Sequence, residues 1–161
     1  MDDAVRPLVE RGVLPRATYV LPDGTPAVPS DHGVLLEDAG GDPDAVAAHF
    51  RLRFVAAGGD ARQADDEHSA WLSGEYGACL FATTPEAIVA KGFLMGAITA
   101  LLARPAPSDI RWATATRAAV DALDSLERPF ALYDRQRWGP VSRDRLITAT
   151  KERFPDLWSA A

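Results

Sequence analysis

The sequence has little of the sulfur and imidazole chemistry that most readily reveals a function. Cys79 is the only cysteine among 161 residues, so an internal disulfide is excluded and a reducing, cytoplasmic compartment is expected. The three histidines, His32, His49 and His68, lack the short spacing typical of zinc ligands. We therefore predict no metal site and no cofactor.

Long apolar runs and catalytic motifs are also missing. No stretch of about 18 consecutive apolar residues occurs, so we expect no membrane span. The acidic start, MDDAVRPLVERG, has no apolar segment of the signal-peptide kind. The G-x-S-x-G, H-E-x-x-H, Walker and dinucleotide-binding glycine patterns are absent. The sequence therefore supports none of the common motif-bearing enzyme classes, and whether the chain is an enzyme stays open.

Positive charge is scarce overall and gathers near the C-terminus. The net charge is −6; residues 1–75 contain 14 acidic residues and 6 arginines, whereas residues 128–153 contain 7 basic and 3 acidic residues. Because phosphate binding requires a basic face, the acidic half argues against nucleic acid as a partner. The basic C-terminal stretch needs a separate explanation.

Hydrophobic periodicity predicts a mainly helical (α+β) protein. The pattern over 85–103 is apolar on nearly all sides, which favours a central helix. The segment EYGACLF, 75–81, fits either a buried strand or a tight connection. We expect four to five helices around the central one in a single domain, with a helix-hairpin-loop appendage over 1–41 and a helical core over 42–161. The predicted elements are helices over 3–11, 43–57, 61–73, 85–103, 109–127 and 142–154, a β-hairpin within 17–28 and a loop over 29–41.

Capping residues set the expected helix starts. Asp42 caps the helix that Pro43 opens, Ser108 caps the helix over 109–127, and Ser142 caps the last helix. On the 109–127 helix, one apolar face is expected from Ile110, Ala113, Val120 and Leu123.

Two further groups have structural interpretations. Cys79 lies in the apolar context GACLF and is expected to be a buried small hydrophobe rather than a nucleophile activated by His68. The acidic cluster over 65–67 is expected to be a solvated helix face.

The segment LYDRQRWGPVSRDRL, 132–146, is the strongest candidate for a functional site. It places Arg143 and Arg145 in the first turn of a helix, where the helix dipole disfavours cations. A bound anion would remove this conflict, because arginine side chains and free backbone N–H groups could both point to it. The candidate anion- or partner-binding residues are Tyr133, Arg135, Arg137, Trp138, Ser142, Arg143 and Arg145.

The negative charge that these arginines require has three possible sources. It could belong to a small-molecule anion, to a carboxylate of a partner protein, or to the chain's own acids, namely Asp134, Asp144 or the N-terminal half. We expect Arg143 and Arg145 to lie close to such a charge. Carboxylates, internal or from a partner, are favoured over a small-molecule anion because ion-pair networks are common.

Three segments together resemble a known family: WLSGEYGACL (71–80), TPEAIVAKGFLMGAITALLA (84–103) and AVDALDSLERPFALYDRQRWGPVSRDRLITATKERFP (119–155). They resemble small, largely actinobacterial natural product biosynthesis proteins with a domain of unknown function. The resemblance implies a role in secondary metabolism, such as antibiotic biosynthesis, as the small partner of a larger catalytic subunit. It also suggests an association with aziridine or azabicycle formation by sulfate elimination. The family has no established catalytic residues to carry over.

Relatives of this kind often begin with a helix-turn-helix-like segment that leads into an L-P-x-x-x-Y-V hairpin. Here Leu14-Pro15 and Tyr19-Val20 match its end, but only one short helix precedes them. We therefore expect an accessory subunit of a biosynthetic enzyme complex. The alternatives are a stand-alone small enzyme or anion-binding protein that uses residues 133–145, and a degenerate helix-turn-helix regulator.

Overall fold

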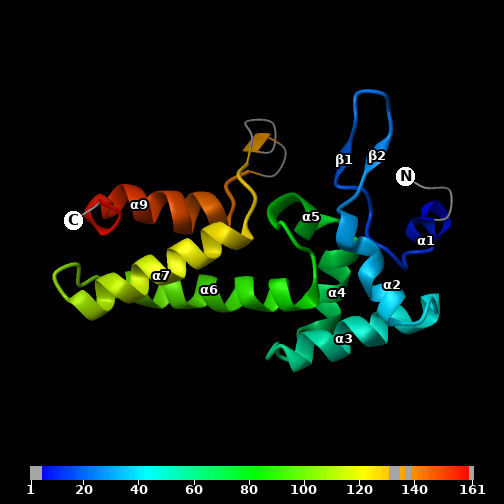
Figure 1. The fold of residues 1–161 in the computed structure, drawn as a ribbon, viewed down its shortest axis with the longest axis horizontal. Helices are drawn as coiled ribbons and strands as arrows, with labels where there is room; N and C mark the ends of the chain where they lie inside the picture. Colours follow the sequence, from blue (N-terminus) through cyan, green and yellow to red (C-terminus); the bar gives the residue numbers. More distant parts are fainter. Residues whose placement is uncertain (1–4, 131–134, 137–138, 160–161) are drawn as a thin grey trace. The chain divides into compact units, whose positions relative to one another are not determined.

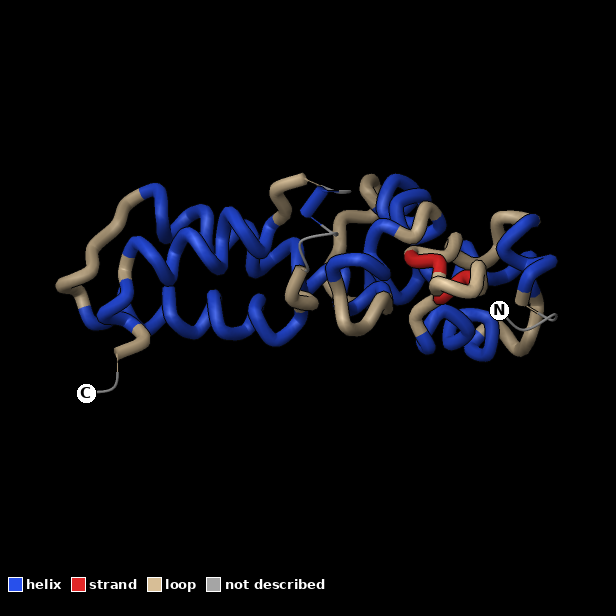
Figure 2. The backbone as a smooth tube through the Cα atoms, turned by 90° about the horizontal axis from the view of Figure 1, so that it is seen from above, coloured by secondary structure: helices blue, strands red, loops and turns tan. Residues whose placement is uncertain are grey.

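The structure, a computed structural model, describes residues 5–130, 135–136 and 139–159. These residues are mainly helical, with a small antiparallel hairpin near the N-terminus, which confirms the predicted fold class (Figures 1 and 2). The chain divides into two compact units, unit 1 (1–89) and unit 2 (90–161). This division lies within the predicted 85–103 helix. The single domain with an appendage over 1–41 stays a prediction.

Unit 1 consists of short helices and the hairpin. In the hairpin, Tyr19 pairs with Ala27 and Val20 with Pro26. Its turn is closed by the backbone N–H of Thr25, which donates to the Asp23 carboxylate at 2.9 Å. The elements are α1 (Arg6–Glu10), β1 (Tyr19–Val20), β2 (Pro26–Ala27), the 3-10 helix η1 (Ser30–Gly33), α2 (Val34–Asp38), the 3-10 helix η2 (Pro43–Ala45), α3 (Val46–Ala56), α4 (Ala64–Leu72) and α5 (Glu75–Cys79).

Two segments of unit 1 differ from the expectation. The loop predicted over 29–41 is wrong, because η1 and α2 form there and bury Leu35. The segment 75–81 is neither a strand nor a plain connection, since α5 occupies most of it. Both helices span about one turn, which is too short for helical periodicity to show in the sequence.

The helix α3 supplies the aromatic centre of unit 1. Val46, Phe50 and Phe54 are buried at the predicted spacing of four. The Asp42 side chain accepts the backbone N–H of Asp44 at 3.0 Å, as expected of the capping residue before Pro43. Phe50 also contacts the indole of Trp71 on α4, with 5.6 Å between ring centroids.

Unit 2 contains long helices packed around one apolar cluster. The helix α6 (Pro85–Ala103) has the predicted bounds, and its first turn, through Val89, belongs to unit 1. It is followed by α7 (Ile110–Leu126), the π-helical segment η3 (Arg143–Thr148), α9 (Ala149–Arg153) and the 3-10 helix η4 (Pro155–Leu157). Buried Ile98, Val120, Leu123 and Ile147 form the core of this unit.

The start and buried face of α7 differ in detail from the prediction. Asp109, and not Ser108, caps the helix by accepting the backbone N–H of Arg111 at 2.8 Å. Ile110 lies outside the core, with 78% of its surface exposed. The buried stripe is Trp112, Thr116, Val120 and Leu123, and the Trp112 indole donates to the carbonyl oxygen of Leu101 at 2.9 Å.

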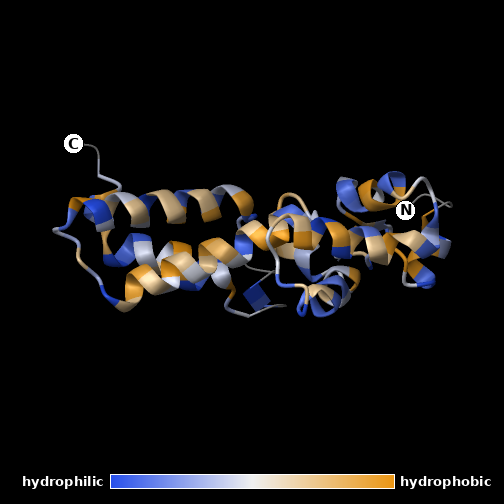
Figure 3. Ribbon diagram, turned by 90° about the horizontal axis from the view of Figure 1, so that it is seen from below, coloured by the Kyte–Doolittle hydropathy of each residue, from blue (hydrophilic) through white to orange (hydrophobic). Residues whose placement is uncertain are grey.

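The helix α6 is central to unit 2 but is not buried all round. Ile98 is fully buried in the core, whereas most other residues of the helix are exposed or half-buried. Apolar residues are distributed along the helices of both units, so apolarity alone does not identify the buried face (Figure 3). By length and composition alone, α6 is the one described helix that could cross a membrane.

Candidate polar site at the start of the last helix

The structure describes four of the seven predicted site residues: Arg135, Ser142, Arg143 and Arg145. The other three, Tyr133, Arg137 and Trp138, lie outside the described residues, as does Asp134.

The last helix begins at Ser142, where the sequence placed it, but the cap differs from the prediction. Ser142 has helical backbone angles and makes no side-chain capping bond. Its hydroxyl instead donates to the Glu127 carboxylate. The following segment, η3, is π-helical, a form that occurs mostly as a single widened turn within a helix. Ser142 therefore links the start of the last helix to the end of α7.

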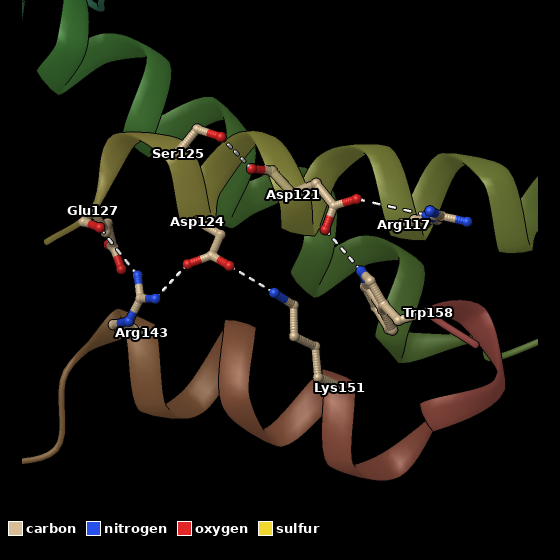
Figure 4. Close-up of polar contacts among 8 residues, drawn as sticks. All are labelled: Arg117, Asp121, Asp124, Ser125, Glu127, Arg143, Lys151 and Trp158. Atoms are coloured by element: carbon tan, nitrogen blue, oxygen red, sulfur yellow. Dashed lines mark hydrogen bonds and ion pairs between the residues drawn. The ribbon is translucent and has the colours of Figure 1, made fainter. Parts of the chain in front are cut away.

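Carboxylates along α7 supply much of the negative charge that the last helix requires. The guanidinium of Arg143 pairs with Asp124 and also donates to the backbone carbonyl of Glu127 at 3.0 Å (Figure 4). The ammonium of Lys151 lies 2.6 Å from the second oxygen of Asp124. We call Asp121, Asp124 and Glu127 the acidic row of α7.

The same row also binds the C-terminal end of the last helix. The indole N–H of Trp158 donates to Asp121 at 2.7 Å. The Lys151 ammonium lies 5.7 Å from the centroid of the Trp158 ring, within the range of a cation–π contact. The acidic row therefore joins α7 to both ends of the final helical segment.

Glu127 is the most buried member of the row, with 1% of its surface exposed. Besides Ser142, its Oε1 pairs with the ammonium of Lys91 on α6 at 3.3 Å. The Lys91 side chain is 13% exposed, so both charges are largely removed from water. A buried charge persists only with compensating partners, and this contact ties α6, α7 and the last helix together.

The other two described arginines of the stretch have different environments. Arg135 pairs with Asp144 at 2.8 Å, and the second oxygen of Asp144 lies 3.5 Å from the backbone nitrogen of Val141. Asp144 thus provides the acidic group that a first helical turn favours. Arg145 is exposed and forms no ion pair with a described residue, so the expected nearby negative charge is not found for it within the described part of the chain.

The electrostatics of Asp124 agree with a structural pairing. Burial raises the pKa of this carboxyl, but the hydrogen bonds from Lys151 and Arg143 outweigh burial, and the net pKa is lowered. Asp124 therefore remains ionised when both cations are in place.

For Arg143, the predicted nearby negative charge is confirmed, and its source is internal. The expected internal acids were Asp134, Asp144 and those of the N-terminal half, whereas the acids that Arg143 contacts are Asp124, through its carboxylate, and Glu127, through its backbone carbonyl. One signal was present: acids recur at intervals of three along VDALDSLERP, 120–129, which places them along one side of a helix. Pairing that side with Arg143 required knowledge of the helix packing.

The remaining candidate groups have structural partners. Cys79 is buried and its thiol lies 3.8 Å from the carbonyl oxygen of Tyr76. In the acidic cluster, Asp65 pairs with Arg51, and Glu67 accepts the Tyr76 hydroxyl. Across the described part of the chain, no group of three or more His, Cys, Asp or Glu residues could hold a metal ion.

Fold and site together define a small, mainly helical protein whose arginine-rich C-terminal stretch is partly neutralised by its own carboxylates. The chain belongs to a family of unknown function, DUF6058, whose pattern matches residues 46–155. The match includes α3 to α9 and therefore the whole acidic row. No curated protein and no solved structure matches the chain.

Proposed function

We propose that this protein is a cytoplasmic accessory subunit that binds a larger catalytic protein in actinobacterial natural product biosynthesis. The sequence resemblance supports the biosynthetic context, including the production of antibiotics. Aziridine or azabicycle formation by sulfate elimination is the reaction that the complex would support. The observation that carries the partner-binding role is the exposed apolar side of α6.

This side of α6 carries no charge and consists of small side chains around one phenylalanine. Phe93 is 62% exposed, and a methyl group added at Gly92 or Gly96 would meet no atom within 4 Å. Between residues 87 and 103 the only charged side chain is Lys91, which pairs with Glu127. We call this surface the open face of α6; its exposed residues are Gly92, Phe93, Gly96, Ala97, Thr99, Ala100 and Ala103.

The open face suits a protein partner better than a small anion. Interface cores are depleted of charge and enriched in aromatic residues, and small residues allow a partner helix to approach closely. The contacts of Arg143 and Arg135 favour the same conclusion, because internal carboxylates already pair with both. The alternative of a stand-alone enzyme or anion-binding protein has one feature in its favour, Arg145, which is exposed and has no ion-pair partner among the described residues.

A site-specific cross-linking experiment in the native host tests this proposal. A photoreactive phenylalanine analogue replaces Phe93 in one strain and Ile110 in a control strain, since both positions are exposed and apolar. We expect the first strain alone to give a covalent adduct with a biosynthetic enzyme encoded by a neighbouring gene. Mass spectrometry identifies the adduct.

Copurification provides the second measurement. Phe93→Ser should abolish recovery of that enzyme, whereas Ile110→Ser should leave it unchanged, and both variants should melt like the wild type. Recovery of monomer alone from cells that make the product would overturn the accessory-subunit proposal. Conversion of a pathway intermediate by the isolated chain would favour the stand-alone enzyme.

A further inference from the structure

Unit 1 contains a cluster of rings that is separate from the acidic row and from the open face of α6. The His68 ring stacks on Trp71 with 5.7 Å between centroids, and His32 meets the same indole edge-on at 6.2 Å. Phe50 contacts both His68, at 5.1 Å, and Trp71, at 5.6 Å. His32 and His68 are 36 positions apart in the sequence, yet both rings contact Trp71.

Three nitrogen atoms of this cluster are buried without a hydrogen-bond partner within the described part of the chain: His32 Nδ1, His68 Nε2 and Trp71 Nε1. The His32 and Trp71 residues are only 4% and 2% exposed, so bulk water does not satisfy these atoms. Native structures leave few buried polar atoms unpaired, because each costs free energy. Two of these atoms lie on rings that contact the third ring, Trp71, and one shared partner is the simplest way to pair all three.

The chemistry of the three nitrogens defines that partner. Indole N–H can only donate, whereas a neutral imidazole has one donor and one acceptor nitrogen. Burial lowers the pKa of His32 to about 4, and burial together with the nearby Arg51 lowers the pKa of His68. Both rings are therefore neutral at pH 7 and can accept a hydrogen bond.

The ring centroids of His68 and His32 lie 5.7 and 6.2 Å from that of Trp71. At hydrogen-bond distances of about 2.9 Å, one oxygen joins two nitrogens that lie up to about 6 Å apart. A hydroxyl oxygen accepts from the Trp71 N–H and donates to an imidazole nitrogen, whereas an ammonium offers Trp71 no acceptor. A carboxylate would bring an uncompensated charge into an apolar ring cluster.

We propose that His32, His68 and Trp71 form a binding site for one neutral hydroxyl group, supplied either by a water molecule or by a small hydroxylated ligand. A water molecule has two O–H donors and can donate a hydrogen bond to both imidazoles, whereas an alcohol has one and can donate to a single imidazole. Buried waters typically make about three hydrogen bonds of this kind.

Nuclear magnetic resonance of the nitrogen-15-labelled full chain, with native mass spectrometry of the same sample, tests the site. We expect the Trp71 indole proton to resonate downfield and both histidines to be neutral. The acceptor nitrogen should be hydrogen-bonded on both rings if the oxygen belongs to water and on one ring if it belongs to an alcohol. Cross-relaxation of this proton with water identifies water as the source, and a mass excess lost on denaturation identifies a ligand. An upfield indole proton, with neither cross-relaxation nor added mass, indicates an N–H contact to a ring face and overturns the proposal.

Two variants provide an independent readout. Trp71→Phe removes the indole N–H and keeps an aromatic ring, so the bridging oxygen loses its donor. The resonance of each imidazole nitrogen that is hydrogen-bonded to this oxygen should then shift. Phe54→Leu is the matched control, because Phe54 stacks on Phe50 at 6.1 Å and contributes no nitrogen. Equal effects of the two variants would overturn the proposal, and the wild-type measurement remains decisive if Trp71→Phe does not fold.

Discussion

At the scale of single residues, the C-terminal arginines differ in their environments although they lie close together in the sequence. Arg143 is enclosed by Asp124 and the carbonyl of Glu127, whereas Arg145, two positions later, is exposed. Charge-assisted hydrogen bonds contribute more when they are shielded from water. The two arginines are therefore expected to differ in their contribution to stability.

Arg143→Ala should lower the free energy of unfolding by about 1–2 kcal/mol, because it removes a half-buried ion pair and a hydrogen bond. Arg145→Ala, the control, should change it by less than about 0.5 kcal/mol. Urea denaturation followed by circular dichroism measures both. Equal losses in the two variants would show that the contact with Asp124 does not stabilise the fold.

His32 should make stability depend on pH. In the unfolded chain its pKa is near 6.5, and burial lowers it to about 4 in the folded chain. Between these values the unfolded state binds more protons, so stability falls as the pH drops from about 6.5 to about 4 and is unaffected by His32 above that range. The full loss corresponds to about 3 kcal/mol.

Urea midpoints of the wild type and of His32→Leu at pH 7 and pH 5 measure this effect. The variant should lose much of the wild-type pH dependence, with His68 retaining a part in the same direction. A His32→Leu slope identical to that of the wild type would contradict the expectation.

At the scale of elements, two helical glycines show how packing decides what a residue does. Gly77 on α5 lies against Thr18, and a Cβ at this position would come within 2.2 Å of the threonine hydroxyl oxygen. That hydroxyl donates to the carbonyl oxygen of Gly74 at 3.1 Å, so it is held in place. Gly96, on the open face of α6, has no such neighbour.

Gly77→Ala should therefore destabilise the protein by about 1–3 kcal/mol through overpacking. Gly96→Ala should stabilise it by up to about 1 kcal/mol, because alanine favours the helix and meets no obstacle. Thermal unfolding monitored by circular dichroism distinguishes the two. A stabilising Gly77→Ala would show that α5 does not pack closely against Thr18.

At the scale of the whole molecule, the charge distribution argues against the regulator hypothesis. The net charge is −6. Sequence-independent DNA binding depends on a basic face and weakens steeply with salt.

The purified chain should therefore leave duplex DNA unbound at low salt in a gel-shift assay. Salt-sensitive retardation of the duplex would restore the helix-turn-helix alternative. The measurement is independent of the open face of α6, so its outcome leaves the cross-linking experiment interpretable.

The sequence by itself determined the helical class, the hairpin, the bounds of α6 and the buried spacing of Val46, Phe50 and Phe54. These features follow from local rules, because periodicity, prolines and capping residues act within a few positions of one another. Helices of a single turn, such as α2 and α5, carry too few residues for these rules to apply.

Only the tertiary structure decided which residues meet. Arg143 pairs with an acid 19 positions earlier, and His32 shares Trp71 with His68, because packing brings distant turns of the chain together. Helix packing also determines that Ile110 and one side of α6 are exposed. Periodicity identifies the sides of a helix that can be buried, and the number of neighbouring helices determines which of those sides are buried.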